Sequence, residues 1–151
     1  LSSDEKTNNF INDISPQHIV LGDRQHITQV LINLLSNARD ASDTDTPITT
    51  RSTAHNHTVT LEVEDHGRGI PDSIKDSIYA PFVTSKDPGK GTGLGMAVVH
   101  RIVEEHFGHI SIDSPINSDF TGTRVNITLP RYLEANTKAA PENNHDESNI
   151  E

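Results

Sequence analysis

Apolar residues recur at intervals of three and four in two stretches of this chain, and each stretch predicts an amphipathic helix. The stripe of the first helix consists of Ile27, Val30, Leu31, Leu34 and Ala38. Asp23 precedes it and is a suitable N-cap, because its carboxylate can accept hydrogen bonds from the first free backbone N–H groups. The second helix is predicted from about Leu94 to Phe107, with Gly108 as its stop signal.

Alternation of apolar and polar residues predicts the strands. We expect strands at residues 46–53, 58–64, 109–114 and 123–129, with a hairpin at His55-Asn56 between the first two. Two shorter apolar patches, at residues 10–11 and 19–21, predict two short strands before the first helix. Pro71 is suited to the first position of a short helix that ends near Ile78. Strands before, between and after two long helices indicate an α+β fold, a two-layer sandwich of a mixed sheet with helices on one face.

Length and charge narrow the class of protein. The chain has 151 residues, and we expect one domain over residues 1–132 followed by a tail over residues 133–151. That tail holds five acids and one lysine, which account for −4 of the net charge of −10, and we expect it to be disordered. An acidic chain without a basic face predicts no nucleic-acid partner.

Cysteine usage and hydropathy set the expected compartment. The absence of cysteine excludes disulfides and thiolate chemistry and is typical of a reducing environment. No apolar run approaches the length of a membrane span, and no signal peptide is visible, so we expect no direct membrane contact. The sequence therefore predicts a cytoplasmic domain, which is compatible with the cytoplasmic part of a membrane-bound sensor.

The stretch V-T-L-E-V-E-D, residues 59–65, carries a carboxylate into a predicted core. Residues two apart on a strand face the same side, so Asp65 shares the inward face of Val63. A buried charge without a partner is costly. Asp65 opens the pattern D-x-G-x-G-I, and one interpretation is an Asp that caps its own tight turn. The inward parity favours the other, a carboxylate kept for a donor on a ligand, such as an exocyclic amine.

Two asparagines lie four residues apart on the first predicted helix, at the edge of its apolar stripe. Asn33 and Asn37 are therefore neighbours on one helix face. Taken alone, they are more typical of a solvated polar edge. The sharper hypothesis is a pair of amide oxygens that meet a cation or a phosphate.

The stretch PFVTSKDPGKGTGLG, residues 81–95, leads directly into the second predicted helix. A glycine-rich turn at a helix N-terminus favours anion binding, because free N–H groups and the helix dipole converge there. Lys86 and Lys90 add positive charge. The spacing differs from the Walker pattern, and the composition predicts a mobile lid over a phosphate chain.

The order of these blocks carries a resemblance. N-x-x-x-N on a helix, D-x-G-x-G-I after a strand, P-F-V-T-S-K, G-K-G-T-G-L-G before a helix and a terminal G-T strand occur in sequence over about residues 15–130. This arrangement resembles the catalytic ATP-binding domain of sensor histidine kinases, of the GHKL superfamily with its Bergerat-type fold. The P-F-V-T-S-K and glycine blocks are particularly similar to the nitrogen-regulation and dicarboxylate-sensor branch.

The resemblance implies a Mg-ATP site and assigns roles to individual positions. Asp65 would accept a hydrogen bond from the adenine amine, and Asn37 with Asn33 would meet Mg²⁺ and the phosphates. The remaining implied contacts with ATP are Gly67, Gly69 and Ile70 at the adenine, Thr123 through water, and Lys86, Lys90, Gly91, Thr92, Gly93, Leu94 and Gly95 at the phosphates. The implied activity is transfer of the γ-phosphoryl group to a histidine on a dimeric acceptor-helix domain, and onward to a response regulator.

Two departures from the family pattern affect these expectations. Many members carry Lys or Arg three residues after the second asparagine, where this chain has Asp40 beside Arg39. The phosphate charge would then be met by the loop lysines, by Arg39 or by Mg²⁺. None of the nine histidines lies in an acceptor setting, H-E followed shortly by Pro, so we expect no autophosphorylation by this chain alone.

Two alternative functions compete with the kinase. Hydrolytic GHKL ATPases need a general base four residues before the metal-binding Asn, and here that position is Asn33, which cannot accept a proton at neutral pH. The other alternative is a non-enzymatic module that binds nucleotide as a signal. Intact Asp65, asparagines and glycines argue against it, because a degenerate site would have lost some of them.

Overall fold

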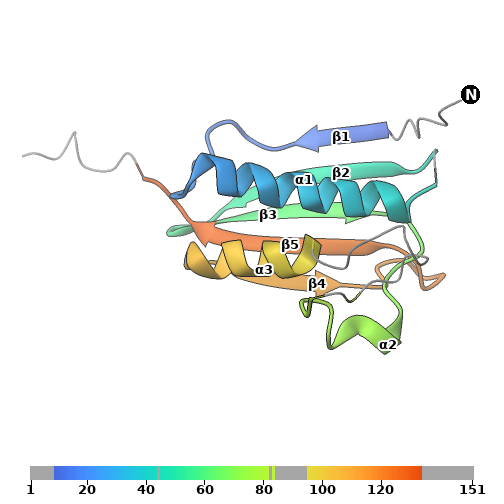
Figure 1. Cartoon of the computed structure of the whole chain (residues 1–151). Coiled ribbons are helices and arrows are strands. Elements are labelled where there is room, and N and C mark those ends of the chain that lie inside the picture. The colour runs from blue at the N-terminus through green and yellow to red at the C-terminus, as the bar shows by residue number, and fades with distance from the viewer. Residues whose placement is uncertain (1–8, 44, 82, 84–94, 134–151) are drawn as a thin grey trace, which may run out of the picture.

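The computed structural model describes residues 9–43, 45–81, 83 and 95–133. Its centre is one five-stranded sheet in the order β1-β2-β3-β5-β4 (Figure 1). The strands are β1 (Asn9–Asp13), β2 (Pro47–Ala54), β3 (Thr58–Asp65), β4 (His109–Asp113) and β5 (Thr123–Pro130). Only the β1–β2 pair is parallel, and the other three pairs are antiparallel. The sheet is therefore mixed, as the sequence predicts.

Two long helices form the second layer. α1 (Arg24–Ala41) and α3 (Gly95–Glu105) run in opposite directions across one face of the sheet, while the short α2 (Asp72–Lys75) lies at one end (Figure 1). The C-terminal end of α1, the N-terminal end of α3 and the end of β3 consequently meet at the same edge of the domain. The predicted α+β sandwich is confirmed. Within the described ranges, no helix has the length and apolar character that crossing a membrane requires.

The core lies between the helices and the sheet. Val30, Leu34 and Ala38 of α1 are buried, in agreement with the predicted stripe. They pack with Val99, Ile102 and Val103 of α3 and with Ile48, Val63, Ile110, Ile127 and Leu129 of the sheet. Burying such a side chain contributes about 1.5–3 kcal/mol, so this cluster holds the two layers together.

The start of α1 agrees with the prediction from the sequence, and the end of α3 differs from it. Asp23 caps α1 as predicted, because its Oδ1 accepts from the N–H groups of Gln25 and His26 at 2.9 and 3.1 Å. α3 ends differently: Phe107, rather than Gly108, takes the left-handed conformation, with φ of 58°. Gly108 is needed for another reason, since an added Cβ would lie 2.5 Å from the carbonyl oxygen of Thr128.

Two predicted elements are shorter than expected. Residues 19–21 form no strand and make only an isolated bridge between Val20 and Arg131. The predicted helix from Pro71 to Ile78 is reduced to α2, with Pro71 as its N-cap. Beyond α2 the backbone continues in turns. Each turn is closed by a hydrogen bond to the residue three positions earlier, from Ser77 N to Ile74 O and from Ala80 N to Ser77 O. Of the predicted tail, only Leu133 lies within the described residues.

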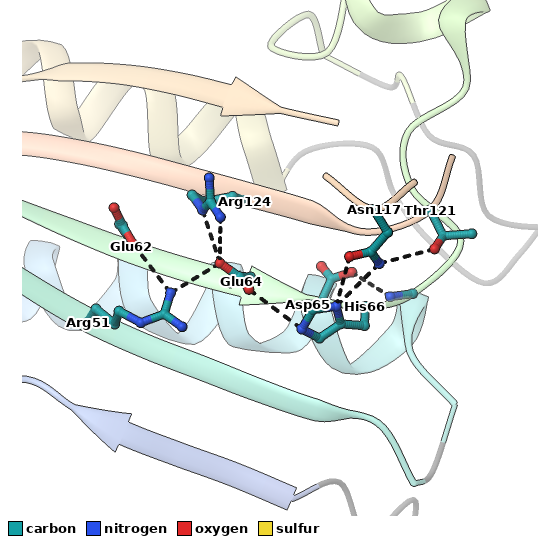
Figure 2. Close-up of polar contacts among 9 residues, drawn as sticks. Arg51, Glu62, Glu64, Asp65, His66, Asn117, Thr121 and Arg124 are labelled. Carbon is teal, nitrogen blue, oxygen red and sulfur yellow. Dashed lines mark hydrogen bonds and ion pairs between the residues drawn. The ribbon is translucent and has the colours of Figure 1, made fainter. Parts of the chain in front are cut away.

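Glu64 departs from the expectation that the polar side of β3 faces water, because it is only 7% exposed. Its Oε2 accepts from Arg51 Nη1 of β2 at 3.1 Å and from Arg124 Nε of β5 at 3.0 Å, and Arg124 Nη2 lies 2.9 Å from the same oxygen (Figure 2). His66 Nε2 lies 3.5 Å from its other oxygen. Burial raises the pKa of the Glu64 carboxyl, but the hydrogen bonds and charges of the two arginines outweigh burial and leave this pKa below its usual value.

We expect Glu64→Gln to lower the free energy of unfolding at neutral pH by about 1–2 kcal/mol, a modest figure because both arginines are more than one-third exposed to screening water. Since the folded-state pKa is lowered, this stabilisation is present above the ordinary glutamate pKa and is lost as pH falls below it. Denaturant unfolding at about pH 7 and about pH 4 should show a difference between variant and wild type that shrinks in acid.

Glu62→Gln is the matched control, because Glu62 contacts only Arg51, at 3.5 Å, among the ion pairs of this cluster. It should change stability little at either pH. An equal effect of the two substitutions would show that Glu64 does not hold the cluster.

Candidate functional site

A cavity of about 210 Å³ opens at the edge where α1, α3 and β3 converge. Its wall combines apolar side chains from both layers with a few polar groups. The apolar lining comes from Leu34, Ala38, Ala41, Val63, Ile70, Ile74, Ile78, Val83, Met96, Ile112 and Val125. The polar lining comes from Asn37, Asp65, Arg68 and Thr123, with Gly69 and Gly95 adding backbone. A mostly apolar cavity with a few placed polar groups is typical of a small-molecule site.

Asp65 stands at the end of β3 with its carboxylate in this wall. It is 6% exposed and lines the cavity together with Val63, so the predicted inward parity is confirmed. Its Oδ1 accepts from the N–H of Gly67 at 2.9 Å. The turn-cap interpretation is therefore confirmed for Oδ1, and the residue also lines the cavity, where a ligand could reach it. Within the described residues, no recorded hydrogen bond donates to Oδ2. Burial raises the pKa of Asp65, and the bond from Gly67 opposes this shift without cancelling it.

The three positions of the glycine loop are used differently. Gly67 does not belong to the cavity lining: it packs on the end of α1, where an added Cβ would lie 2.1 Å from the carbonyl oxygen of Ala41. The next residue reinforces this contact, since Arg68 N donates to the same oxygen at 3.1 Å. Gly69 and Ile70 do line the cavity, and Gly69 has φ of 77°, which favours glycine. Gly67 thus anchors the loop, and the two later residues form the wall.

The two asparagines of α1 face the start of α3. Asn37 lines the cavity, and its amide atoms lie about 4 Å from where a Cβ of Gly95 would be. Asn33 lies one turn earlier and outside the lining. Its Nδ2 donates to the carbonyl of Gly95 at 3.4 Å, and its Oδ1 accepts from Gln29 at 3.2 Å. Asn33 therefore holds α3 against α1, while Asn37 faces the cavity.

Thr123 begins β5 and pairs with Asp65 across the two strands. It is 7% exposed and lines the cavity. Arg68, the x of G-x-G, also lines the cavity, although it is not among the predicted site residues. The other predicted contacts, Lys86, Lys90, Gly91, Thr92, Gly93 and Leu94, lie outside the described residues, as does most of the predicted lid.

The cavity has two chemically different sides. Asp65 and Thr123 offer oxygen acceptors to a ligand that carries a donor, between apolar walls that suit a flat ring. Asn37 and the first residue of α3 form the other side, where the helix N-terminus favours negative charge. The described residues include no group of three or more His, Asp or Glu arranged to hold a metal ion. The arrangement suits a ligand with a ring that donates hydrogen bonds and an anionic tail.

Comparison with known proteins agrees with this geometry. The model of the family described as histidine kinase-, DNA gyrase B-, and HSP90-like ATPase matches residues 22–133. Sensor kinase CckA of Brucella abortus (strain 2308) is 38% identical over 130 residues, which cover 76% of this chain and 13% of that protein. The sensory histidine kinase/phosphatase NtrB of Rhodobacter capsulatus is 40% identical over 108 residues, covering 62% of this chain and 30% of that protein.

A solved structure supports the same relationship. The mycobacterial sensor histidine kinase MprB superposes with a TM-score of 0.75 and 27% identity, over 83% of this chain and 84% of that one. The chain thus spans nearly all of one solved kinase chain but less than a third of the two curated relatives.

Proposed function

This chain belongs to the histidine kinase-, DNA gyrase B- and HSP90-like ATPases, as a catalytic domain of the sensor histidine kinase type, and from this we propose that it transfers the γ-phosphoryl group of Mg-ATP to a histidine on an acceptor-helix domain. The observation that carries the proposal is Asp65, a buried carboxylate with a raised pKa in the wall of an apolar cavity. A charge kept at such a position is explained by a ligand that donates to it.

The proposed binding mode places the adenine between the apolar walls. Its exocyclic amine donates to Oδ2 of Asp65, because Oδ1 is already occupied by Gly67. Gly69 and Ile70 line the ring, and Thr123 contacts it directly or through water.

The phosphates then extend toward Asn37 and the first turn of α3. Lys86, Lys90 and residues 91–94 complete the phosphate contacts in this proposal, on the strength of the family pattern alone. Arg39, the last basic residue of α1, is exposed and remains a further source of positive charge.

Mg²⁺ fits this donor set. The ion prefers oxygen ligands and usually retains waters and substrate phosphates rather than a cage of protein groups. Asn37 supplies an amide oxygen beside the α3 N-terminus, whereas the amide of Asn33 is engaged with Gly95 and Gln29. Asn37 is therefore the proposed protein ligand, and Asn33 holds the helix that receives the phosphates. When bound, Mg²⁺ would neutralise charge on the phosphate oxygens.

The proposed contribution of this chain is position and charge, because the nucleophile belongs to another domain. In phosphoryl transfer the negative charge spreads over the transferred oxygens, so oriented donors and helix-end amides lower the barrier. This chain would bind and orient ATP, and a partner domain would supply the histidine that attacks. A response regulator would then receive the phosphoryl group. Both partners are part of the proposal.

The base-reading role predicts a preference for adenine over guanine nucleotides. Guanine presents a carbonyl oxygen where adenine presents an amine, so Asp65 would face an acceptor and both groups would remain unpaired. This mismatch costs about 1–3 kcal/mol, or about five- to 150-fold in affinity. Calorimetric titration of ADP and GDP with Mg²⁺ measures the ratio. Both nucleotides carry the same phosphates, so equal affinities would remove Asp65 from base recognition.

A further inference from the structure

Ser114 lies just after β4, behind the cavity wall and outside its lining. Its hydroxyl connects three parts of the site. It accepts from the N–H of Ile70 at 2.9 Å, donates to the carbonyl of Gly122 at 3.0 Å, and accepts from Oγ1 of Thr123 at 3.2 Å. A hydroxyl has one hydrogen and two lone pairs, so these three bonds use its full capacity.

The direction of the Ser114–Thr123 bond has a consequence for the cavity. Because the hydrogen of Ser114 is committed to Gly122, Thr123 must be the donor between the two hydroxyls. The hydrogen of Thr123 is then turned away from the ligand, and Thr123 Oγ1 offers only lone pairs to the cavity. Thr123 pairs with Asp65 across the strands, so two acceptors stand together at this corner.

Ser114 also fixes the spacing of the wall. Its bond to Ile70 ties the glycine loop to the start of β5, and its Oγ lies 3.2 Å from where a Cβ of Gly69 would be. The loop and the strand that carry the base contacts are thereby held together by one side chain that does not itself touch the ligand space.

We propose that Ser114 is a positioning residue that sets nucleobase specificity, by holding Thr123 as a hydrogen-bond acceptor toward the ring. The inference rests on the proposed function, since it assumes that the base lies beside Asp65 and Thr123. Two fixed acceptors favour a ring that presents an amine and reject one that presents a carbonyl oxygen. Without Ser114, the hydroxyl of Thr123 can turn its hydrogen into the cavity. It can then donate that hydrogen to the carbonyl oxygen of the wrong base.

The test compares Mg-ADP with Mg-IDP, because hypoxanthine replaces the adenine amine with a carbonyl oxygen and leaves the sugar and phosphates unchanged. Dissociation constants are measured for the unmodified chain, Ser114→Ala, Thr123→Val and the double variant. Ser111→Ala is the matched control: it removes a hydroxyl from β4, where Ser111 Oγ accepts only from Asn126 Nδ2 among the recorded bonds and the residue is exposed. Thermal melting checks that each variant is folded.

We expect Ser114→Ala to reduce the preference for ADP over IDP by about three- to tenfold, the worth of one hydrogen bond, and Ser111→Ala to leave it unchanged. Thr123→Val should narrow the same ratio, and adding Ser114→Ala to it should change the ratio no further, because Ser114 acts through Thr123. If Ser114 is merely structural, its loss would weaken the binding of both nucleotides equally. The ratio of their dissociation constants would then stay constant, and the inference would be overturned.

Three further outcomes are decisive. If Ser114→Ala does not fold, an unchanged ratio in Thr123→Val overturns the inference, while a narrowed ratio supports it. Failure of the unmodified chain to bind either nucleotide would overturn the proposed function itself. If the unmodified chain prefers ADP over IDP and the variants show the same preference, only the role of Ser114 is overturned.

Discussion

Asp65→Asn should weaken the binding of adenine nucleotides by about ten- to hundredfold without destabilising the domain. The reason lies in the hydrogen bond from Gly67 N to Asp65 Oδ1. An asparagine can keep that bond only by turning its oxygen toward Gly67, which leaves its NH₂ group facing the cavity. A donor then meets the adenine amine, and both remain unpaired. Titration with Mg-ADP measures the loss.

The stability of the Asp65→Asn variant is the second quantity to measure. Burial raises the pKa of Asp65, so the ionised carboxylate destabilises the fold at neutral pH relative to the unfolded chain. Replacing it with a neutral isostere should leave the melting temperature unchanged or higher. Asp113→Asn is the matched control, because Asp113 is exposed at the end of β4 and its Oδ2 accepts from Asn126. Normal nucleotide binding by Asp65→Asn would reduce Asp65 to a turn cap.

The second large effect is the near absence of ATP hydrolysis by this chain. General-base assistance is typically worth about 10²–10⁴-fold in rate, and its lack should leave phosphate release near background. The hydrolytic branch of the family would need a carboxylate at position 33. Here Asn33 has its amide engaged with Gly95 and Gln29, and it cannot accept a proton from water. Steady-state phosphate release with Mg-ATP measures this rate.

The alternation of inward and outward residues along β3 is what allows the position of Asp65 to be predicted from the sequence. A period of two is enough to place Asp65 on the face of Val63, and in the structure both residues line the cavity. The helical spacing likewise places Asn33 and Asn37 on one face, and N-cap chemistry identifies Asp23. These are local properties of the backbone, so they can be derived without knowing what packs where.

Features that depend on contacts between distant residues could not be predicted in this way. Glu64 shares the polar side of β3, yet Arg51 and Arg124 bury it from strands on either side. The sequence motif predicts that Gly67 belongs to a ligand-binding loop, whereas its close contact in the structure is with Ala41 at the end of α1. Ser114 carries no motif, and its role follows only from the three groups around its hydroxyl.

Local signals also misled where tertiary structure prevailed. Gly108 is a typical helix stop, but Phe107 takes the left-handed turn and Gly108 lies against the backbone of Thr128. Residues 19–21 have the composition of a strand and yet form only an isolated bridge, between Val20 and Arg131 just after β5. Neither error affects the site, because both positions lie away from the cavity wall.

The most direct test of the account is incubation of the purified chain with γ-labelled Mg-ATP, alone and with a dimeric acceptor-helix domain from a related sensor kinase. Protein label and free phosphate are followed together, with the acceptor domain alone as the control. We expect label on the acceptor only when both proteins are present, acid-labile and base-stable as a phosphohistidine should be. Little free phosphate should come from this chain alone. Rapid release of phosphate by the unmodified chain, or stable label on one of its own histidines, would contradict it.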